Sequence, residues 1–402
     1  MWVYCEQNLS SISQFVQFGN MSFDTALTRL LGIRIPVVQG GLQWVAYAEL
    51  AAAVSNAGGL GIINALTQPN PEGLRQEIRK TRSLTKLPFG VNITLLPALN
   101  PPDYPGFVKV IIEEDIKIVE TAGNSPGPVI QRLKEAGIIV IHKATTIRHA
   151  KAAIRLGVDV LSIDGFECAG HVGESDIASL ILNSRARQEL GNVPFIASGG
   201  FADGYGLVSA LSLGAAGVNM GTRFMCTVEA PIHVNVKQAI VDSDEHQTTL
   251  ILRRWKNTSR MYSNSQTKKT IEIETKSVSD DFAQVAPVVS GVKGREVLVD
   301  GDIEHGVSPS TLALGSLRLE GILTFLRCGT PAKLWVLSMT SRLLQTYSRG
   351  SKGKPRKPFG ISPDLVSTRQ IRPDYDIFCG EHGVLATAGL ESDLTYLIND
   401  AI

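Results

Sequence analysis

Eight short apolar runs rich in β-branched residues alternate along this chain with segments that have the 3.6-residue period of a helix. The runs span residues 35–39, 60–64, 89–94, 118–121, 138–143, 160–164, 195–198 and 217–220. Helical segments lie between them at 49–56, 71–82, 129–136, 147–156 and 204–213. This alternation is typical of parallel strands joined by crossover helices, so it restricts the chain to the α/β class.

Two architectures have this alternation, a closed (β/α)8 TIM barrel and an open, doubly wound sheet. An open sheet usually has fewer units and one glycine-rich crossover, whereas polar or glycine residues follow strand after strand here. A ring of strand ends facing one ligand explains that recurrence. We therefore expect a (β/α)8 barrel over residues 21–245, with its active site at the C-terminal ends of the strands.

The chain on either side of this pattern gives weaker signals. Residues 1–20 precede the first unit and are expected to form an N-terminal extension. Beyond the barrel, the alternation in IEIET, residues 271–275, predicts an exposed strand. The stretch RGSKGKPRKP, residues 349–358, has the composition of a flexible linker, and a nuclear-localisation signal is the less favoured interpretation.

The charge, cysteine and hydropathy patterns limit the kinds of binding partner and compartment that we expect for this protein. The formal net charge is +1, so no general field attracts nucleic acid or an anionic membrane. The five cysteines show no paired spacing, which argues against a disulfide framework or zinc site and favours a reducing, cytoplasmic compartment. No apolar run approaches the roughly 20 residues of a membrane-spanning helix. We expect neither a metal nor a membrane partner.

Two glycine-rich strand ends come late in the expected barrel, IASGGFADG at 196–204 and VNMGTRF at 218–224. Glycines there expose backbone N–H groups to a ligand, and the loops after strands seven and eight of such barrels usually bind phosphate. Tight turns without a ligand are the weaker interpretation. We predict a phosphate site.

Polar side chains end other strands and suggest what carries the phosphate. Asn92 and Thr94 end the third strand, Lys143 the fifth and Asp164 the sixth. A lysine near the pyrimidine edge of a flavin favours the anionic reduced ring. An ion pair between Lys143 and a barrel carboxylate is an equally good interpretation of the sequence.

One histidine has the context of a functional residue. His171 lies in GFECAGHVGE, residues 165–174, between glycines on the loop after the sixth strand. There the imidazole can project over the barrel mouth, and with an unperturbed pKa of about 6.5 it exchanges protons near neutrality. His142 is the second candidate. Cys168 is predicted to be a small buried residue rather than a nucleophile.

The same stretches carry a family resemblance. They include VVQGGLQWVAYAELAAAVSNAGGLG, LPFGVNITLLP, VETAGNSPG, VIHKATTIRHA, SIDGFECAGHVGESDI, IASGGFADGYGL and LGAAGVNMGTRFMCT. Together they resemble the nitronate monooxygenase family, also called 2-nitropropane dioxygenase-like, whose members are FMN-containing (β/α)8 barrels.

The resemblance implies site residues and a lid. Its implied FMN contacts are Val38, Gln39, Thr94, Lys143, Asp164, Ala169, Gly170, Ser198, Gly199, Gly200, Gly221 and Thr222, and we add Asn92 from its strand end. His171 matches the catalytic or substrate-contacting histidine. Residues 246–330 would form the segment that covers the flavin, and the tail at 331–402 resembles nothing in the family.

The implied reaction is oxidation of an alkyl nitronate with O2 through FMN. The form GFECAGH resembles a subgroup linked to NADH:quinone reduction, in which FMN accepts hydride from NADH and passes electrons to a quinone. A flavin-type enoyl-ACP reductase and a non-enzymatic binding scaffold remain further alternatives. The expected partners are a small-molecule substrate and O2, with a homodimer as the expected assembly.

Overall fold

The computed structural model describes residues 23–95, 101–123, 126–307, 377–378 and 385–386. The predicted N-terminal extension, residues 1–20, lies outside the described residues. So does the predicted tail with its linker at 349–358, apart from strands β12 (Ile377–Phe378) and β13 (Leu385–Ala386), which pair antiparallel.

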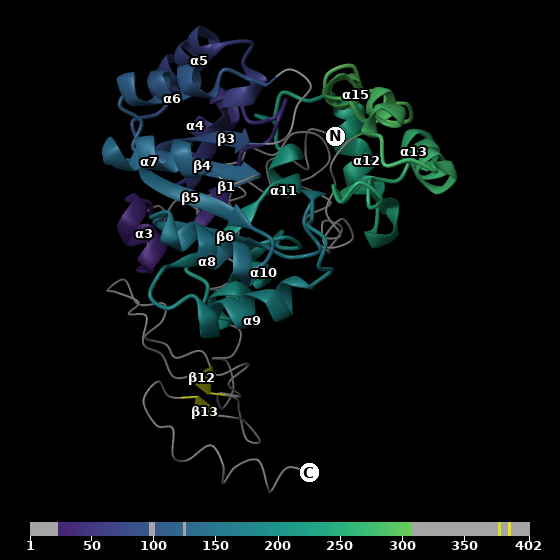
Figure 1. The fold of residues 1–402 in the computed structure, drawn as a ribbon. Coiled ribbons are helices and arrows are strands. Elements are labelled where there is room, and N and C mark those ends of the chain that lie inside the picture. Colours follow the sequence, from purple (N-terminus) through teal and green to yellow (C-terminus); the bar gives the residue numbers. More distant parts are fainter. Residues whose placement is uncertain (1–22, 96–100, 124–125, 308–376, 379–384, 387–402) are drawn as a thin grey trace, which may run out of the picture.

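Eight parallel strands close into a barrel, which confirms the predicted fold and excludes the open sheet (Figure 1). Closure comes from pairing of the first strand with the last, with Val38 opposite Asn219. The strands are β1 (Val37–Gln39), β2 (Leu60–Asn64), β3 (Phe89–Leu95), β4 (Ile118–Gly123), β5 (Ile139–Ala144), β6 (Val160–Asp164), β8 (Phe195–Ser198) and β9 (Val218–Met220).

Helix α3 (Ala26–Leu31) precedes β1, and the other helices follow the strands. They are α4 (Ala48–Asn56), α5 (Pro71–Leu84), α6 (Tyr104–Glu113), α7 (Gly127–Glu135), α8 (Ile147–Arg155), α9 (Ser179–Glu189), α10 (Gly204–Ser212), α11 (Thr222–Met225) and α12 (Val234–Asp242). Side-chain caps set several starts: Asn70 accepts from the Gly73 N–H at α5, and Thr146 from the His149 N–H at α8. The sequence analysis did not predict α6 and α9.

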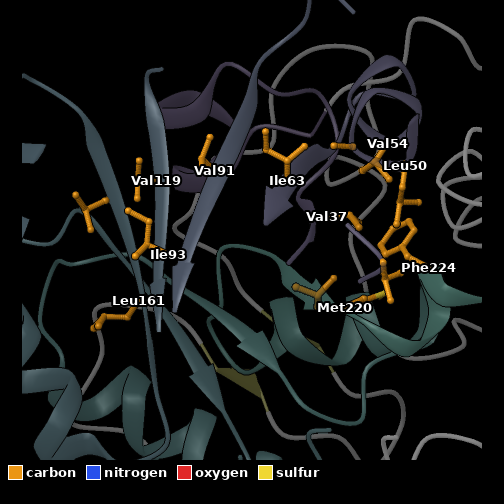
Figure 2. Packing of buried hydrophobic residues seen from close by; sticks show 14 of the residues in the cluster. Val37, Leu50, Val54, Ile63, Val91, Ile93, Val119, Leu161, Met220 and Phe224 are labelled. Carbon is orange, nitrogen blue, oxygen red and sulfur yellow. The ribbon is translucent and has the colours of Figure 1, made fainter. Parts of the chain in front are cut away.

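The outward faces of the strands pack against the helices in one large apolar cluster. Figure 2 shows Val37, Ile63, Val91, Val119 and Leu161 of the strands in this cluster. All five side chains are completely buried. This packing fixes the outer side of the barrel wall.

The inward faces form two layers along the barrel axis. A lower apolar layer contains Val38, Leu60, Ile62, Ile118, Ile141, Val160 and Ile196. Because side chains two residues apart on a strand share a face, the next inward positions are polar. They are Asn64, Glu120, Lys143, Ser162 and Ser198, to which β3 and β9 add Asn92 and Asn219. We call these seven side chains the polar layer.

A separate three-stranded sheet stands at the barrel mouth. It consists of β10 (Thr248–Ile251), β11 (Ser259–Tyr262) and β7 (Gly170–His171), in the order β10-β11-β7. It is followed by α13 (Ser265–Lys276), α14 (Ala286–Val289) and α15 (Gly291–Leu298). The chain beyond the barrel thus reaches back to the His171 loop.

The strand predicted at 271–275 is wrong, because these residues belong to α13. Asn264 caps that helix, accepting from the Thr267 N–H, and the Thr267 hydroxyl accepts from the Asn264 N–H. The Glu274 carboxylate accepts the backbone N–H groups of Leu252 and Arg254. A cap and tertiary contacts thus override a short period-2 pattern. No helix in the described part of the chain is long and apolar enough to cross a membrane.

Candidate active site

A cavity of about 790 Å³ opens at the C-terminal ends of the barrel strands. Its size is within the range of about 300–1,000 Å³ that is usual for small-molecule and cofactor sites. The predicted site residues that line it are Asn92, Thr94, Lys143, Asp164, Ala169, Gly170, His171, Ser198, Gly199, Gly200, Gly221 and Thr222. The strand ends therefore converge as predicted on one cavity.

Two predicted contact residues, Val38 and Gln39, are not among the lining residues. The Val38 side chain lies in the lower apolar layer. The Gln39 amide bonds to the backbone of Ile62, donating to its carbonyl at 3.1 Å and accepting its N–H at 3.3 Å. The next two residues, Gly40 and Gly41, line the cavity instead.

The turn after β8 presents backbone rather than side chains to the cavity, as an anion cradle requires. Gly199 and Gly200 have φ of +88° and +82°, a region that side-chain-bearing residues rarely adopt. A Cβ on Gly199 would lie 2.9 Å from the Cys168 N atom and from the Gly165 carbonyl oxygen. Glycine therefore lets this turn pack directly against the backbone of the 165–168 loop.

Thr222, at the neighbouring strand end, supplies an unused hydroxyl. Its Oγ1 is buried and has no hydrogen-bond partner among the described residues. A buried hydroxyl without a partner is costly unless a ligand satisfies it. The cradle and this hydroxyl together fit a phosphate group.

The His171 loop is held by the sheet at the mouth. His171 is paired with Ser259 of β11, and the Val172 N–H donates to the Thr258 carbonyl at 3.1 Å. Glu174 accepts from the Thr258 N–H at 2.9 Å and from its hydroxyl at 2.5 Å. These anchors could not be predicted from local sequence patterns, because they join segments that are 84 residues apart.

A second clamp lies beside these anchors. The Arg260 guanidinium is 4.6 Å from the centroid of the Phe166 ring and donates to the Phe166 carbonyl at 2.9 Å. The loop that carries His171 is therefore fixed at both ends by β11.

His171 lines the cavity as an exposed residue. The protein atoms around its imidazole lower its pKa, and the hydrogen bond with Asn257 and the charge of Glu174 offset this only in part, so the neutral form is favoured. A neutral imidazole can accept a proton or donate one hydrogen bond near neutral pH.

Lys143 forms the ion pair that was one of the two interpretations of the sequence, and it also lines the cavity. Its Nζ lies 3.3 Å from Asp164 Oδ2 and 3.9 Å from Glu120 Oε1, and its side chain lines the cavity. Burial lowers the pKa of Lys143, but Asp164 and Glu120 outweigh it and raise that pKa above its usual value. The cavity therefore contains a permanent cation.

Glu120 is a site residue that the sequence analysis missed. Its carboxylate is completely buried and accepts from the Gly41 N–H at 2.9 Å, Asn92 Nδ2 at 2.7 Å and Asn219 Nδ2 at 2.8 Å. A usable signal was present, because Glu120 stands two residues after Ile118 and so faces inward.

The two other singled-out residues are uncharged. Burial lowers the pKa of His142 to about 4, and its Nδ1 lies 2.9 Å from the Thr121 hydroxyl oxygen. Cys168 is buried, as predicted, and burial raises the pKa of its thiol far above the usual value. A thiol in that state is a poor nucleophile.

Two cationic side chains, Arg148 and Lys256, line the outer rim of the cavity, and neither forms an ion pair with any described residue. His149 and the carboxylate of Glu174 also line the cavity.

Comparison with known proteins gives consistent matches. The family model for nitronate monooxygenase matches residues 24–311. The chain is 39% identical over 226 residues to (3aS,4S,5R,7aS)-5-hydroxy-7a-methyl-1-oxo-octahydro-1H-indene-4-carboxyl-CoA dehydrogenase of Rhodococcus jostii, a match that covers 56% of this chain and 62% of that relative.

Two further proteins match this chain over a larger share of their own length. A probable nitronate monooxygenase of Staphylococcus saprophyticus is 32% identical over 270 residues, which cover 57% of this chain and 76% of the relative. The structure of FabK from Thermotoga maritima has a TM-score of 0.72 and 32% identity, covering 82% of this chain and 98% of FabK.

Proposed function

The chain belongs to the nitronate monooxygenase family, and from this premise we propose that it is an FMN-dependent oxidoreductase that oxidises alkyl nitronates with O2. One observation carries the proposal: a single cavity joins a side-chain-free anion cradle, a charged lysine and a neutral histidine. These are the groups needed to hold a flavin phosphate, to favour a negative ring and to handle a substrate proton.

The residues present fit FMN. The turn at Gly199 and Gly200 and the Thr222 hydroxyl would hold the phosphate, and Lys143 would face the ring. When bound, FMN supplies electron transfer between an organic substrate and O2. The chain's own residues do the rest, which is to bind, orient and move protons.

His171 would handle the substrate. Its neutral imidazole can donate a hydrogen bond to an oxygen of the nitronate anion, or accept the α-proton of the neutral nitroalkane. The cations Arg148 and Lys256 at the rim would attract the anionic substrate. Of the proposed lid, residues 246–330, the part from 308 onward lies outside the described residues. The described part would hold the histidine over the cavity through β11, and residues 21–245 would form the FMN-binding domain.

A second candidate function is oxidation or reduction of an acyl-CoA. The Rhodococcus relative is named a carboxyl-CoA dehydrogenase, and the cationic rim suits the phosphates of coenzyme A. NADH:quinone reduction, a cytoplasmic location and a homodimer stay predictions.

The test is anaerobic mixing of purified protein with candidate donors while the flavin absorbance is followed. We expect a yellow protein whose oxidised-flavin bands bleach with propane-2-nitronate, and O2 uptake when air is admitted. Bleaching only with an acyl-CoA would support the second candidate, and bleaching only with NADH would support quinone reduction. A colourless protein that binds no added FMN would refute the proposal as a whole.

A further inference from the structure

Five side chains of the barrel interior form a closed ring at the floor of the cavity. Lys143 Nζ contacts Asp164 Oδ2 at 3.3 Å, and Asp164 Oδ1 accepts from Ser162 Oγ at 3.0 Å. Asn219 Nδ2 donates to Ser162 Oγ at 3.3 Å and to Glu120 Oε1 at 2.8 Å. Glu120 Oε1 closes the ring 3.9 Å from Lys143 Nζ.

Glu120 also connects this ring to the rest of the floor. Its second oxygen, Oε2, accepts from the Gly41 N–H and from Asn92 Nδ2. The side-chain oxygen of Asn92, Oδ1, in turn accepts from Asn64 Nδ2 at 3.2 Å and from Thr94 Oγ1 at 2.9 Å. One carboxylate therefore orients side chains or turns that belong to β1, β3, β5 and β9.

The charge balance of the ring depends on Glu120. Two carboxylates, Glu120 and Asp164, surround one ammonium group, Lys143. Without Glu120 the ammonium would face a single carboxylate, and the floor would lose one negative charge. Charges buried this deeply are weakly screened, so the loss of one of them acts on any flavin bound above the floor.

We propose that Glu120 is the positioning residue of this site, which fixes Lys143 and the Gly40–Gly41 turn toward the cavity and sets the charge felt by the bound flavin. Glu120 itself is not a lining residue, so it acts through Lys143, Asn92, Asn219 and the Gly41 backbone. This inference rests on the proposed function, because it requires FMN in the cavity.

The experiment compares Glu120→Gln with Glu114→Gln in the FMN-loaded protein. Glu114 is a matched control: it is also a buried carboxylate, with Arg75 at 3.0 Å, Arg79 at 2.8 Å and Arg82 at 3.2 Å, and it does not line the cavity. Glutamine keeps the shape of glutamate but removes the charge and offers one acceptor oxygen to three N–H donors. The measurements are the midpoint potential of bound FMN, the FMN dissociation constant and the melting temperature of the apoprotein.

We expect Glu120→Gln to shift the midpoint potential to more positive values, because loss of a buried negative charge stabilises the more negative, reduced ring. We also expect FMN to bind about tenfold more weakly, since the Gly41 turn loses its anchor. Glu114→Gln should lower the melting temperature and leave the potential unchanged. Glu120→Asp, which keeps the charge, should restore most of the wild-type potential.

Other results overturn the inference. An unchanged potential in Glu120→Gln, with only a lower melting temperature, would reduce Glu120 to a structural residue. Should that variant not fold, Asn219→Ser removes one donor to Glu120 and keeps its charge. The carboxylate is then less neutralised, so the potential should shift to more negative values, and an unchanged potential would contradict the inference. Wild-type protein that binds no FMN would refute the proposed function, whereas bound FMN with an unmoved potential in these variants refutes this inference alone.

Discussion

Substitution of Gly41 by alanine tests whether the turn after β1 is shaped by the polar layer beneath it. A Cβ built on Gly41 lies 2.2 Å from the Asn92 Cβ and 2.3 Å from its Cγ, far inside ordinary contact distance. Asn92 cannot rotate away, because its amide is held by Glu120 at 2.7 Å and by Thr94 at 2.9 Å. The turn must therefore move and give up the Gly41–Glu120 hydrogen bond.

The magnitude follows from these two losses. Overpacking of a tight interior typically costs about 1–3 kcal/mol. A buried charged acceptor that loses a donor adds about 1–3 kcal/mol. The free energy of unfolding should thus fall by about 2–6 kcal/mol, which for a domain of this size lowers the melting temperature by roughly 5–20 °C. Because the displaced turn lines the cavity, FMN affinity should also fall, by about tenfold for each 1.36 kcal/mol of binding free energy that is lost.

The assays are differential scanning calorimetry of the apoprotein and titration of FMN fluorescence quenching. Gly137→Ala is the control: Gly137 also has a positive φ, +71°, but nothing lies within 4 Å of its Cβ position, and it precedes β5 at the opposite barrel end. It should cost about 1–2 kcal/mol of left-handed strain and leave FMN affinity unchanged. Wild-type stability and FMN affinity in Gly41→Ala would refute the packing argument.

Three further predictions concern single residues. His171→Ala should lower turnover by about 100-fold or more while FMN stays bound, and wild-type rates would remove His171 from the site. Thr222→Val keeps the volume but removes the unused hydroxyl, so FMN should bind roughly fivefold to tenfold more weakly, measured by fluorescence, at an unchanged melting temperature. The folded pKa of His142, about 4, is below its unfolded value, so its stabilising contribution is complete above pH 6.5 and lost as pH falls toward 4. Between pH 6.5 and pH 4, the free energy of unfolding measured with denaturant should fall by about 3 kcal/mol more in wild type than in His142→Gln. Identical pH profiles of the two proteins would contradict this prediction.

Much of the fold could be predicted because each strand–helix unit is encoded locally. Strands β2, β6 and β8 have the boundaries expected from their apolar runs. The glycines that follow three of the predicted helices, Gly137, Gly157 and Gly214, each have a positive φ. The failures also have local causes. The α6 helix begins with Asp103 as its cap and a proline in its first turn, a signal that was present and unused.

The site was predictable only at single strand ends. Lys143, Asp164 and the glycine turn at Gly199 were identified because each lies where a strand stops, and His171 because it lies between glycines on the loop after the sixth strand. The contacts between site side chains could not be predicted from the sequence. The ion pair between Lys143 and Glu120, for example, depends on the inward direction of both side chains. The same holds for β11, whose pairing with His171 joins segments 88 residues apart, Ser259 and His171.

The sequence by itself therefore determined the alternation of strands and helices, the glycine turns and the residue types at the barrel mouth, because these depend on local periodicity and backbone freedom. Only the tertiary structure decided that Glu120 and Asn219 meet under the cavity, that β11 clamps the His171 loop, and that residues 271–275 are helical. Long-range contact is the physical reason: pairing of β1 with β9 and of β11 with β7, and the contacts of α13 with the 252–254 turn, join residues that no short window of sequence relates.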